Sequence, residues 1–142
     1  MKKTIQIITI KQVEYMSYFL AKEILSFNEP IPDFSTRFKN ILESCLLTPF
    51  QRFSNRALYP DLFSKASILF YLMVKNHPFQ NGDKRIALTT LLTFLYLNKK
   101  WVNVDVQEFY NFAMWTAQSP ARLKDETVKA IEKFLKLYMV NL

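Results

Sequence analysis

Glycine, histidine and cysteine are almost absent from this sequence of 142 residues. There is one of each: Gly82, His77 and Cys45. Average usage of about 7% would give roughly ten glycines in this length. A single cysteine excludes a disulfide within the chain and is typical of a reducing compartment. One histidine and one cysteine also leave almost no room for a zinc site built from these ligands.

Long apolar runs are missing too. The longest apolar stretch free of charge, residues 86–97, contains 12 residues and includes three threonines. A membrane-spanning helix needs about 20 apolar residues. The start, MKKTIQIITIKQ, is basic, but Gln6 and Lys11 interrupt its short apolar part and no small-residue cleavage site follows. The sequence therefore predicts neither a membrane span nor a signal peptide, and we expect a cytoplasmic protein.

Acidic residues are the minority among the charges. Twelve Asp and Glu against 19 Lys and Arg give a net charge of +7. This charge favours anionic ligands, which are nucleotides, nucleic acid or acidic lipids. The lysines are scattered over Lys2, Lys3, Lys99, Lys100 and one face of the last predicted helix, which favours a solvated surface over nucleic-acid binding. Half of the residues are hydrophobic, which excludes a disordered chain, and residues 1–142 have the size of one domain.

Apolar residues at helical spacing predict an all-α domain of about six helices. The expected helices cover residues 11–27, 37–47, 61–76, 83–98, 105–117 and 122–140. Residues 61–76 are apolar nearly all round, which is typical of a central, buried helix. The remaining segments are predicted as a short strand or extended arm (4–10), two connections (28–36 and 99–104), and a surface loop or small hairpin (48–60).

Periodicity also predicts which side chains of the first two helices face inward. In the first helix these are Val13, Met16, Phe19, Leu20 and Ile24, and in the second they are Phe38, Ile41, Leu42 and Cys45. A small apolar core residue is the favoured interpretation of Cys45.

The only histidine and the only glycine fall in one short segment, HPFQNGDKR, which joins two predicted buried helices. Pro78 disfavours a helical conformation for His77, so the preceding helix should end before it. Gly82 permits a positive φ or a close approach to a ligand. Asp83 falls where a helix N-cap residue is expected.

Lys84 and Arg85 fall in the first turn of the next helix, where cations oppose the helix dipole unless an anion is bound. A helix N-terminus binds anions through its free N–H groups, and arginine can bind phosphate with two hydrogen bonds. Histidine is the side chain most often used as a general base, and Asn81 and Asp83 carry oxygens that suit Mg²⁺. Taken singly, these residues could be an ordinary helix end, turn and cap; together they predict phosphoryl or nucleotidyl transfer to a hydroxyl.

This segment resembles the signature of the Fic/Doc superfamily, H-x-F-x-(D/E)-(G/A)-N-(G/K)-R. The flanking runs LYPDLFSKASILFYLMVKN and IALTTLLTFLYLN are similar to the helices around the motif in Doc-type (death-on-curing) proteins. The resemblance is clearest over about residues 41–100. It implies a compact helical bundle with a central motif loop. It also implies a small flap, here residues 48–57, that docks the target as an added strand.

The resemblance also implies roles for the residues of the motif. His77 would act as the base on a hydroxyl of a target protein, and Phe79 would be a buried anchor. The phosphates of ATP, with Mg²⁺, would be bound by Asn81, Gly82, Asp83, Lys84 and Arg85. Nucleotidyl-transferring Fic proteins usually have Gly at the position of Lys84, whereas Doc-type kinases have Lys. The resemblance therefore favours transfer of the γ-phosphate, with AMP transfer as the alternative.

Doc-type kinases are toxins that modify elongation factor Tu and are silenced by an antitoxin. The chain lacks the [S/T]-x-x-x-E-[G/N] pattern of self-inhibited Fic proteins, so we expect any antitoxin to be a separate molecule. The motif departs from the family at Asn81, where an acid is usual, and at Asp83, where Asn is usual. Either Asp83 binds the metal, or metal binding is weaker, or the protein is a catalytically inactive binding domain. The sequence does not predict an oligomeric state.

Overall fold

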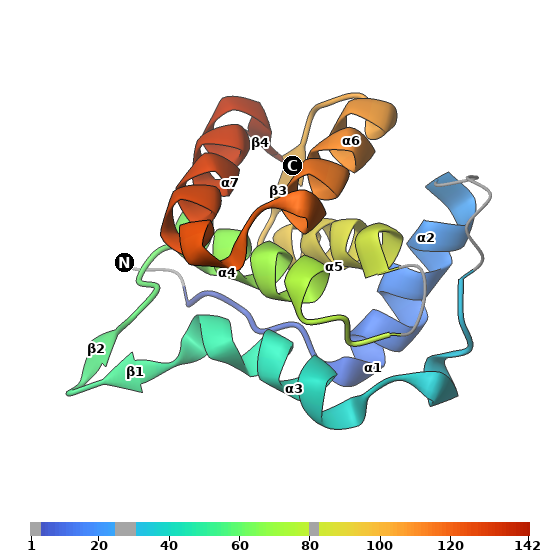
Figure 1. The fold of residues 1–142 in the computed structure, drawn as a ribbon, viewed down its shortest axis with the longest axis horizontal. Coiled ribbons are helices and arrows are strands. Elements are labelled where there is room, and N and C mark those ends of the chain that lie inside the picture. The colour runs from blue at the N-terminus through green and yellow to red at the C-terminus, as the bar shows by residue number, and fades with distance from the viewer. Residues whose placement is uncertain (1–3, 25–30, 80–82) are drawn as a thin grey trace.

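The structure is a computed structural model that describes residues 4–24, 31–79 and 83–142, with the backbone alone for Ile24 and Asp83 (Figure 1). Two helices form its centre, α4 (Leu62–Lys75) and α5 (Asp83–Leu97). Every residue of α4 from Lys65 to Val74 is buried, as its nearly continuous apolar character predicted. Asp61 caps α4, because its carboxylate accepts the Ser64 N–H at 2.7 Å and the Ser64 hydroxyl accepts the Asp61 N–H at 3.2 Å.

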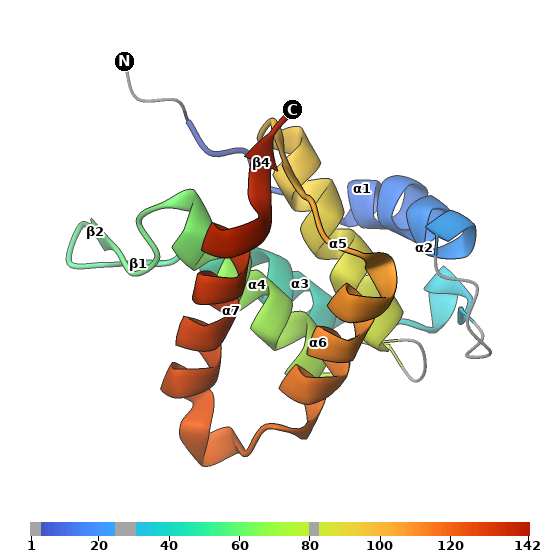
Figure 2. The same ribbon diagram turned by 90° about the horizontal axis from the view of Figure 1, so that it is seen from above.

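The other helices cover this central pair from two sides (Figures 1 and 2). Helices α6 (Val106–Gln118) and α7 (Lys124–Tyr138) pack on one side. On the other side lie α3 (Lys39–Leu47), α1 (Ile10–Gln12) and α2 (Tyr18–Ile24). Short 3-10 turns occupy Phe34–Thr36, Thr48–Phe50 and Ala121–Leu123. The predicted all-α bundle is confirmed, and none of the described helices is long and apolar enough to cross a bilayer.

The first predicted helix is interrupted by a π-helical turn, Val13–Ser17, between α1 and α2. A π turn holds more residues than an α turn, so it shifts the phase of the helix. The inward residues are Val13, Ser17, Tyr18 and Ala21, whereas Phe19 is 65% exposed. The predicted inward position of Phe19 is therefore wrong. The predicted end of this helix, residues 25–27, lies outside the described residues.

Helix α3 begins at Lys39, two residues later than predicted. Its buried residues are Leu42, Cys45 and Leu46, which confirms Leu42 and Cys45 as core residues. Phe38 and Ile41 are 44% and 37% exposed, so their predicted inward positions are wrong. Phe38 has an extended backbone before the helix. Ile41 lies beside the buried face of α3, which is formed by Leu42, Cys45 and Leu46.

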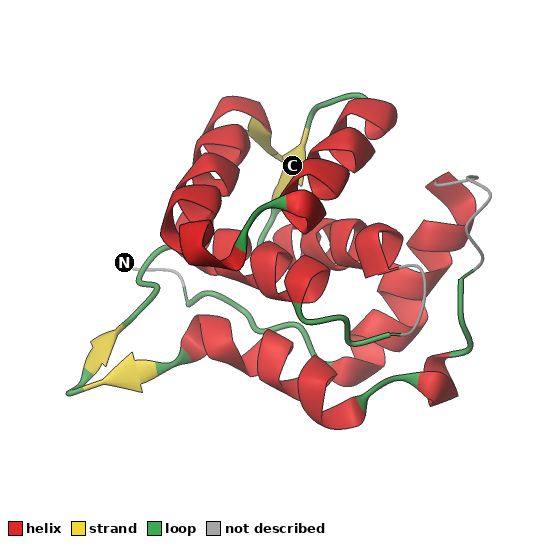
Figure 3. Ribbon diagram, in the orientation of Figure 1, coloured by secondary structure: helices red, strands yellow, loops and turns green. Residues whose placement is uncertain are grey.

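Within the described ranges, two small antiparallel sheets complete the fold (Figure 3). Strands β1 (Arg52–Phe53) and β2 (Arg56–Ala57) form the hairpin predicted for this segment. Its two turn residues, Ser54 and Asn55, have φ of 51° and 63°, as a two-residue hairpin turn requires. Strands β3 (Lys100–Val102) and β4 (Met139–Asn141) pair with Trp101 opposite Val140. We predicted a turn and the end of a helix there, and that was wrong, because strands of three residues carry little periodicity.

Lys65 fastens the hairpin to α4. Its side chain is buried, and its ammonium donates to the carbonyls of Pro49, at 3.2 Å, and of Tyr59. These two residues flank the hairpin on either side. The ammonium also lies 4.9 Å from the centroid of the Phe50 ring. Removal from water lowers the pKa of Lys65, although the nearby Asp61 carboxylate opposes this shift.

Candidate functional site

His77 lies directly after the central helix, at the position where many helices have glycine. Helix α4 ends at Lys75, and Asn76 still donates its N–H to the Leu72 carbonyl at 2.9 Å. His77 then takes φ = 52°, in the left-handed region. This conformation usually costs an L-residue about 1–2 kcal/mol. The residue is exposed, so the imidazole is accessible at the end of a buried helix.

The chain after His77 is fixed by two buried residues. The carbonyl of Pro78 accepts the N–H of Phe38, the residue before α3, at 2.8 Å. The Phe79 ring is fully buried, with its centroid 5.6 Å from that of Tyr18 and 6.2 Å from that of Phe34. Phe79 therefore has the burial that an anchor requires.

The chain before His77 is fixed by Lys75. The Lys75 ammonium donates to the carbonyls of Ala117, at 3.2 Å, and Ser119, at 2.5 Å. These are carbonyls at the end of α6, so the lysine also satisfies acceptors that a helix C-terminus leaves open. With both flanks held, the strained backbone of His77 is maintained by its surroundings, an arrangement that is common at functional sites.

The predicted phosphate-binding residues are described only in part. Gly82 and Asn81 lie outside the described residues, and so does the side chain of Asp83. Helix α5 starts at Asp83, and Lys84 is half-buried in its first turn. The N–H groups of such a first turn have no partner within the helix and can bind an anion.

Arg85 is more deeply buried than Lys84 beside it. Only 4% of it is exposed, and one of its terminal nitrogens donates to the carbonyl of Ala21 at 3.1 Å. This hydrogen bond ties α5 to α2. A guanidinium has five N–H donors, and contact of Arg85 with a phosphate stays a prediction.

The metal site also rests on the undescribed part of the motif. Within residues 4–24, 31–79 and 83–142, no group of three or more His, Cys, Asp or Glu could hold a metal ion. The Asp83 carboxylate and the Asn81 carboxamide, whose placement is not described, stay the predicted ligands. Magnesium prefers oxygen ligands and often binds one or two carboxylates together with substrate phosphates, so the chemistry of this pair fits Mg²⁺.

A hollow of about 350 Å³ lies beside the motif and could not be predicted from the sequence. It is lined by Asn40, Ile41 and Ser44 of α3 and by Asn76, the residue before His77. The three α3 residues are more than 30 residues from Asn76 in the sequence, so no local pattern connects the two walls. Only the packing of α3 against the end of α4 brings them together.

The β1–β2 hairpin lies at the far end of α4 from His77 (Figure 1). Helix α4 has 14 residues, which corresponds to about 20 Å. A target segment added to this hairpin would have to run along the length of α4 to bring a hydroxyl to His77. The docking role of residues 48–57 stays a prediction.

Comparison with protein families gives a match that includes the motif. The model described as the Fic/DOC family matches residues 7–95, which is more than half of the chain. The matched region extends from the arm before α1 to the last turns of α5. Searches of curated proteins and of solved structures gave no match to the chain.

Proposed function

Because this chain belongs to the Fic/DOC family, we propose that it transfers the γ-phosphate of ATP to a hydroxyl group of a target protein. The family generally transfers nucleotide moieties to proteins. Lys84 supports the choice of the γ-phosphate, because its side chain occupies a place where nucleotidyl-transferring relatives usually have glycine. Transfer of AMP to a protein hydroxyl is the alternative reaction of the same fold.

The observation that carries this proposal is the placement of His77. It is exposed, its backbone is held in a strained conformation, and residues 78–82 join it to Asp83, where α5 begins. In the reaction, an imidazole nitrogen of His77 takes the proton of the target hydroxyl. The hydroxyl oxygen forms a bond to the γ-phosphorus, the bond from that phosphorus to the bridging oxygen breaks, and ADP leaves with the electron pair.

The remaining motif residues would bind the nucleotide. The first-turn amides of α5, with Gly82, Lys84 and Arg85, would hold the phosphates. Asp83 and Asn81 would hold Mg²⁺. When bound, the ion would neutralise charge on the phosphate oxygens.

We also propose that the protein is a Doc-type toxin with a separate antitoxin, and that elongation factor Tu is the candidate target. Support comes from the resemblance of residues 41–100 to Doc-type proteins and from the lack of a self-inhibitory pattern in the sequence. The net charge of +7 would favour an acidic antitoxin.

Labelled nucleotides test the reaction directly. The protein is incubated with Mg²⁺, elongation factor Tu or a cell lysate, and ATP labelled at either the α- or the γ-phosphate. We expect label on protein from γ-labelled ATP only, and none with His77→Ala, whose circular dichroism should match that of the wild type. Label from the α-phosphate would establish AMP transfer instead. No label from either position, with no thermal shift in Mg-ATP, would leave a catalytically inactive binding domain.

A further inference from the structure

We propose that the protein forms a symmetric dimer in which residues 10–24 of one copy, the segment from α1 to α2, pack antiparallel against the same segment of a second copy. The contact surface is an exposed row of four side chains, Lys11, Tyr15, Phe19 and Glu23, together with the apolar groove beside it. These four residues are called the outer row below. This inference goes beyond the proposed function and does not depend on it.

The outer row follows from the π-helical turn. In an α-helix of 3.6 residues per turn, positions four apart rotate around the axis by about 40° at each step. The wider π turn at Val13–Ser17 takes in an additional residue, which offsets this rotation. Burial accordingly repeats every four residues. Val13, Ser17 and Ala21 are fully buried, whereas all four residues of the outer row are exposed.

An apolar groove of about 300 Å³ lies beside the outer row. It is lined by Tyr15 and Phe19 of the row, by Tyr96 of α5 and by Trp101 of β3. Figure 2 shows α1 and α2 beside α5. Helices pack by placing the ridge of one into the groove of another. Because this surface carries a ridge and a groove side by side, a two-fold axis lets the ridge of each copy enter the groove of the other.

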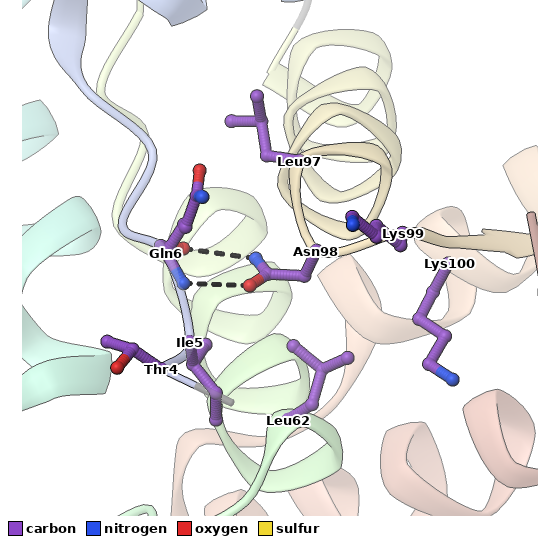
Figure 4. A pocket seen from close by; sticks show the side chains of 8 residues that line it. All are labelled: Thr4, Ile5, Gln6, Leu62, Leu97, Asn98, Lys99 and Lys100. Atoms are coloured by element: carbon purple, nitrogen blue, oxygen red, sulfur yellow. Dashed lines mark hydrogen bonds between the residues drawn. The ribbon is translucent and has the colours of Figure 1, made fainter. Parts of the chain in front are cut away.

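The part of the groove on α5 is held in place by the N-terminal arm (Figure 4). The Gln6 N–H donates to the Asn98 carboxamide oxygen at 2.7 Å, and the Asn98 amide nitrogen donates to the Gln6 carbonyl at 3.0 Å. Asn98 follows Tyr96 by two residues, and Trp101 lies in the paired strand β3. Both aromatic residues therefore have a fixed backbone, so association requires little ordering of this surface.

The charges of the outer row favour a second copy as the occupant. With the two-fold axis midway between Tyr15 and Phe19, Tyr15 meets the partner's Phe19, and Lys11 meets the partner's Glu23 at each end. A parallel pair would bring like charges together at both ends. Complementary charges fix the register of an interface, and like charges disfavour the alternative. The order Lys, Tyr, Phe, Glu at a spacing of four is thus complementary to itself when it is reversed.

The exposed aromatic area also matches what a dimer requires. Tyr15, Phe19 and Tyr96 are 70%, 65% and 51% exposed. Since a whole aromatic side chain has about 150–250 Å² of surface, these fractions correspond to roughly 370 Å². One side of a standard interface buries about 800 Å², of which roughly 450 Å² is apolar. The three rings supply most of this apolar area, and the half-buried Met16 and Leu20 of the groove add to it.

Sedimentation velocity of the full-length protein tests the dimer without nucleotide or target. We expect a monomer–dimer equilibrium with a micromolar dissociation constant. Phe19→Ala should raise this constant at least about tenfold, as the loss of an aromatic residue at the centre of an interface predicts. Phe53→Ala is the matched control, because Phe53 is 74% exposed on the hairpin, and it should change the constant by less than about twofold. Circular dichroism of both variants should match the wild type.

Charge exchange tests the antiparallel order. Lys11→Glu and Glu23→Lys each place like charges at both ends of the pair, so each variant alone should dimerise at least about threefold more weakly at low salt. An equal mixture of the two variants should restore dimers, because opposite charges then meet at both ends. Net charge alone predicts a different result: Lys11→Glu lowers the charge of +7 and would strengthen association.

Three results would overturn the proposal. The first is a wild-type protein that stays monomeric at about 1 mM. The second is a dimer that Phe19→Ala leaves unchanged, which would place the contact on another surface. The third is a mixture of the two charge variants that associates no better than either variant alone. Label transfer to a target by a protein that stays monomeric would overturn the dimer and leave the proposed function in place.

Discussion

Glycine at position 77 should give a more stable fold than alanine at the same position. His77 has φ = 52°, a conformation that costs a residue with a Cβ about 1–2 kcal/mol and that glycine adopts without this cost. Glycine also makes the unfolded chain more flexible, and this lowers the gain in stability by about 0.5–1 kcal/mol. The free energy of unfolding should therefore be about 0.5–1 kcal/mol higher for His77→Gly than for His77→Ala. Both variants lack the imidazole, so the difference isolates the backbone.

The size of the expected thermal shift follows from the length of the chain. An unfolding entropy of about 2.1 cal/mol/K per residue gives roughly 0.3 kcal/mol/K for a chain of this size. The glycine variant should then melt about 2–3 °C above the alanine variant. Thermal unfolding followed by circular dichroism, with urea unfolding as a second measurement, resolves such a difference.

Asn76 provides the control pair. Its φ of −93° and ψ of −3° are right-handed, so alanine should be the more stable residue there, by about 0.5–1 kcal/mol. An alanine variant at position 77 that equals or exceeds the glycine variant would refute the left-handed conformation of His77. If the expected order is found, the chain retains histidine at a position where glycine would stabilise the fold, which supports a chemical role for the imidazole.

Three other predictions concern the anchor, the metal and a helix cap. Phe79→Ala should lower the free energy of unfolding by about 3–5 kcal/mol in urea, and a loss below about 1 kcal/mol would show that the ring is not part of the core. Asp83→Asn should raise the Mg²⁺ concentration needed for half-maximal transfer more than Asn81→Ala does; the opposite order would assign the metal to Asn81. The pKa of Asp33 should lie below its usual range, because its carboxylate accepts two hydrogen bonds from Ser35, each at 3.1 Å. The bond from the N–H has the larger effect, and the bond from the hydroxyl has the smaller one. These hydrogen bonds stabilise the fold at pH values above the pKa that the carboxyl has in the unfolded chain. The stabilisation is lost as the pH falls through the pKa of the carboxyl in the folded chain. In a carbonyl ¹³C titration, Ser35→Ala should raise this pKa only partly, and an unchanged value would exclude the hydroxyl as a cause.

The central part of the fold could be predicted from the sequence because its signals are local and strong. Helix α4 is apolar over consecutive turns and is followed by a proline, so both its burial and its end could be inferred. The β1–β2 hairpin follows a proline and contains Ser54 and Asn55, residue types that favour turns. In the motif, His77 and Gly82 could be identified as candidate site residues because each is the only residue of its kind in the sequence.

Other features depend on contacts that no local pattern encodes. The π-helical turn before α2 changes the phase of the helix, which is why Phe19 is exposed although its spacing predicted burial. The β3–β4 pair joins segments about 40 residues apart, through strands too short to show alternation. Arg85 was expected to face phosphates, and its hydrogen bond to Ala21 depends on how α2 packs against α5. The hollow beside His77 likewise exists only through the packing of α3.

Lys65 allows the sequence of the hairpin to change without a change in the rest of the fold. Since its ammonium binds a carbonyl on each side of the hairpin, the two ends of that segment are set by α4 and not by the sequence between them. Residues at the tip, such as Ser54 and Asn55, are exposed, so insertions or exchanges there need not be transmitted to the core. A lineage of such proteins could diversify this tip freely while the buried lysine preserves the junction.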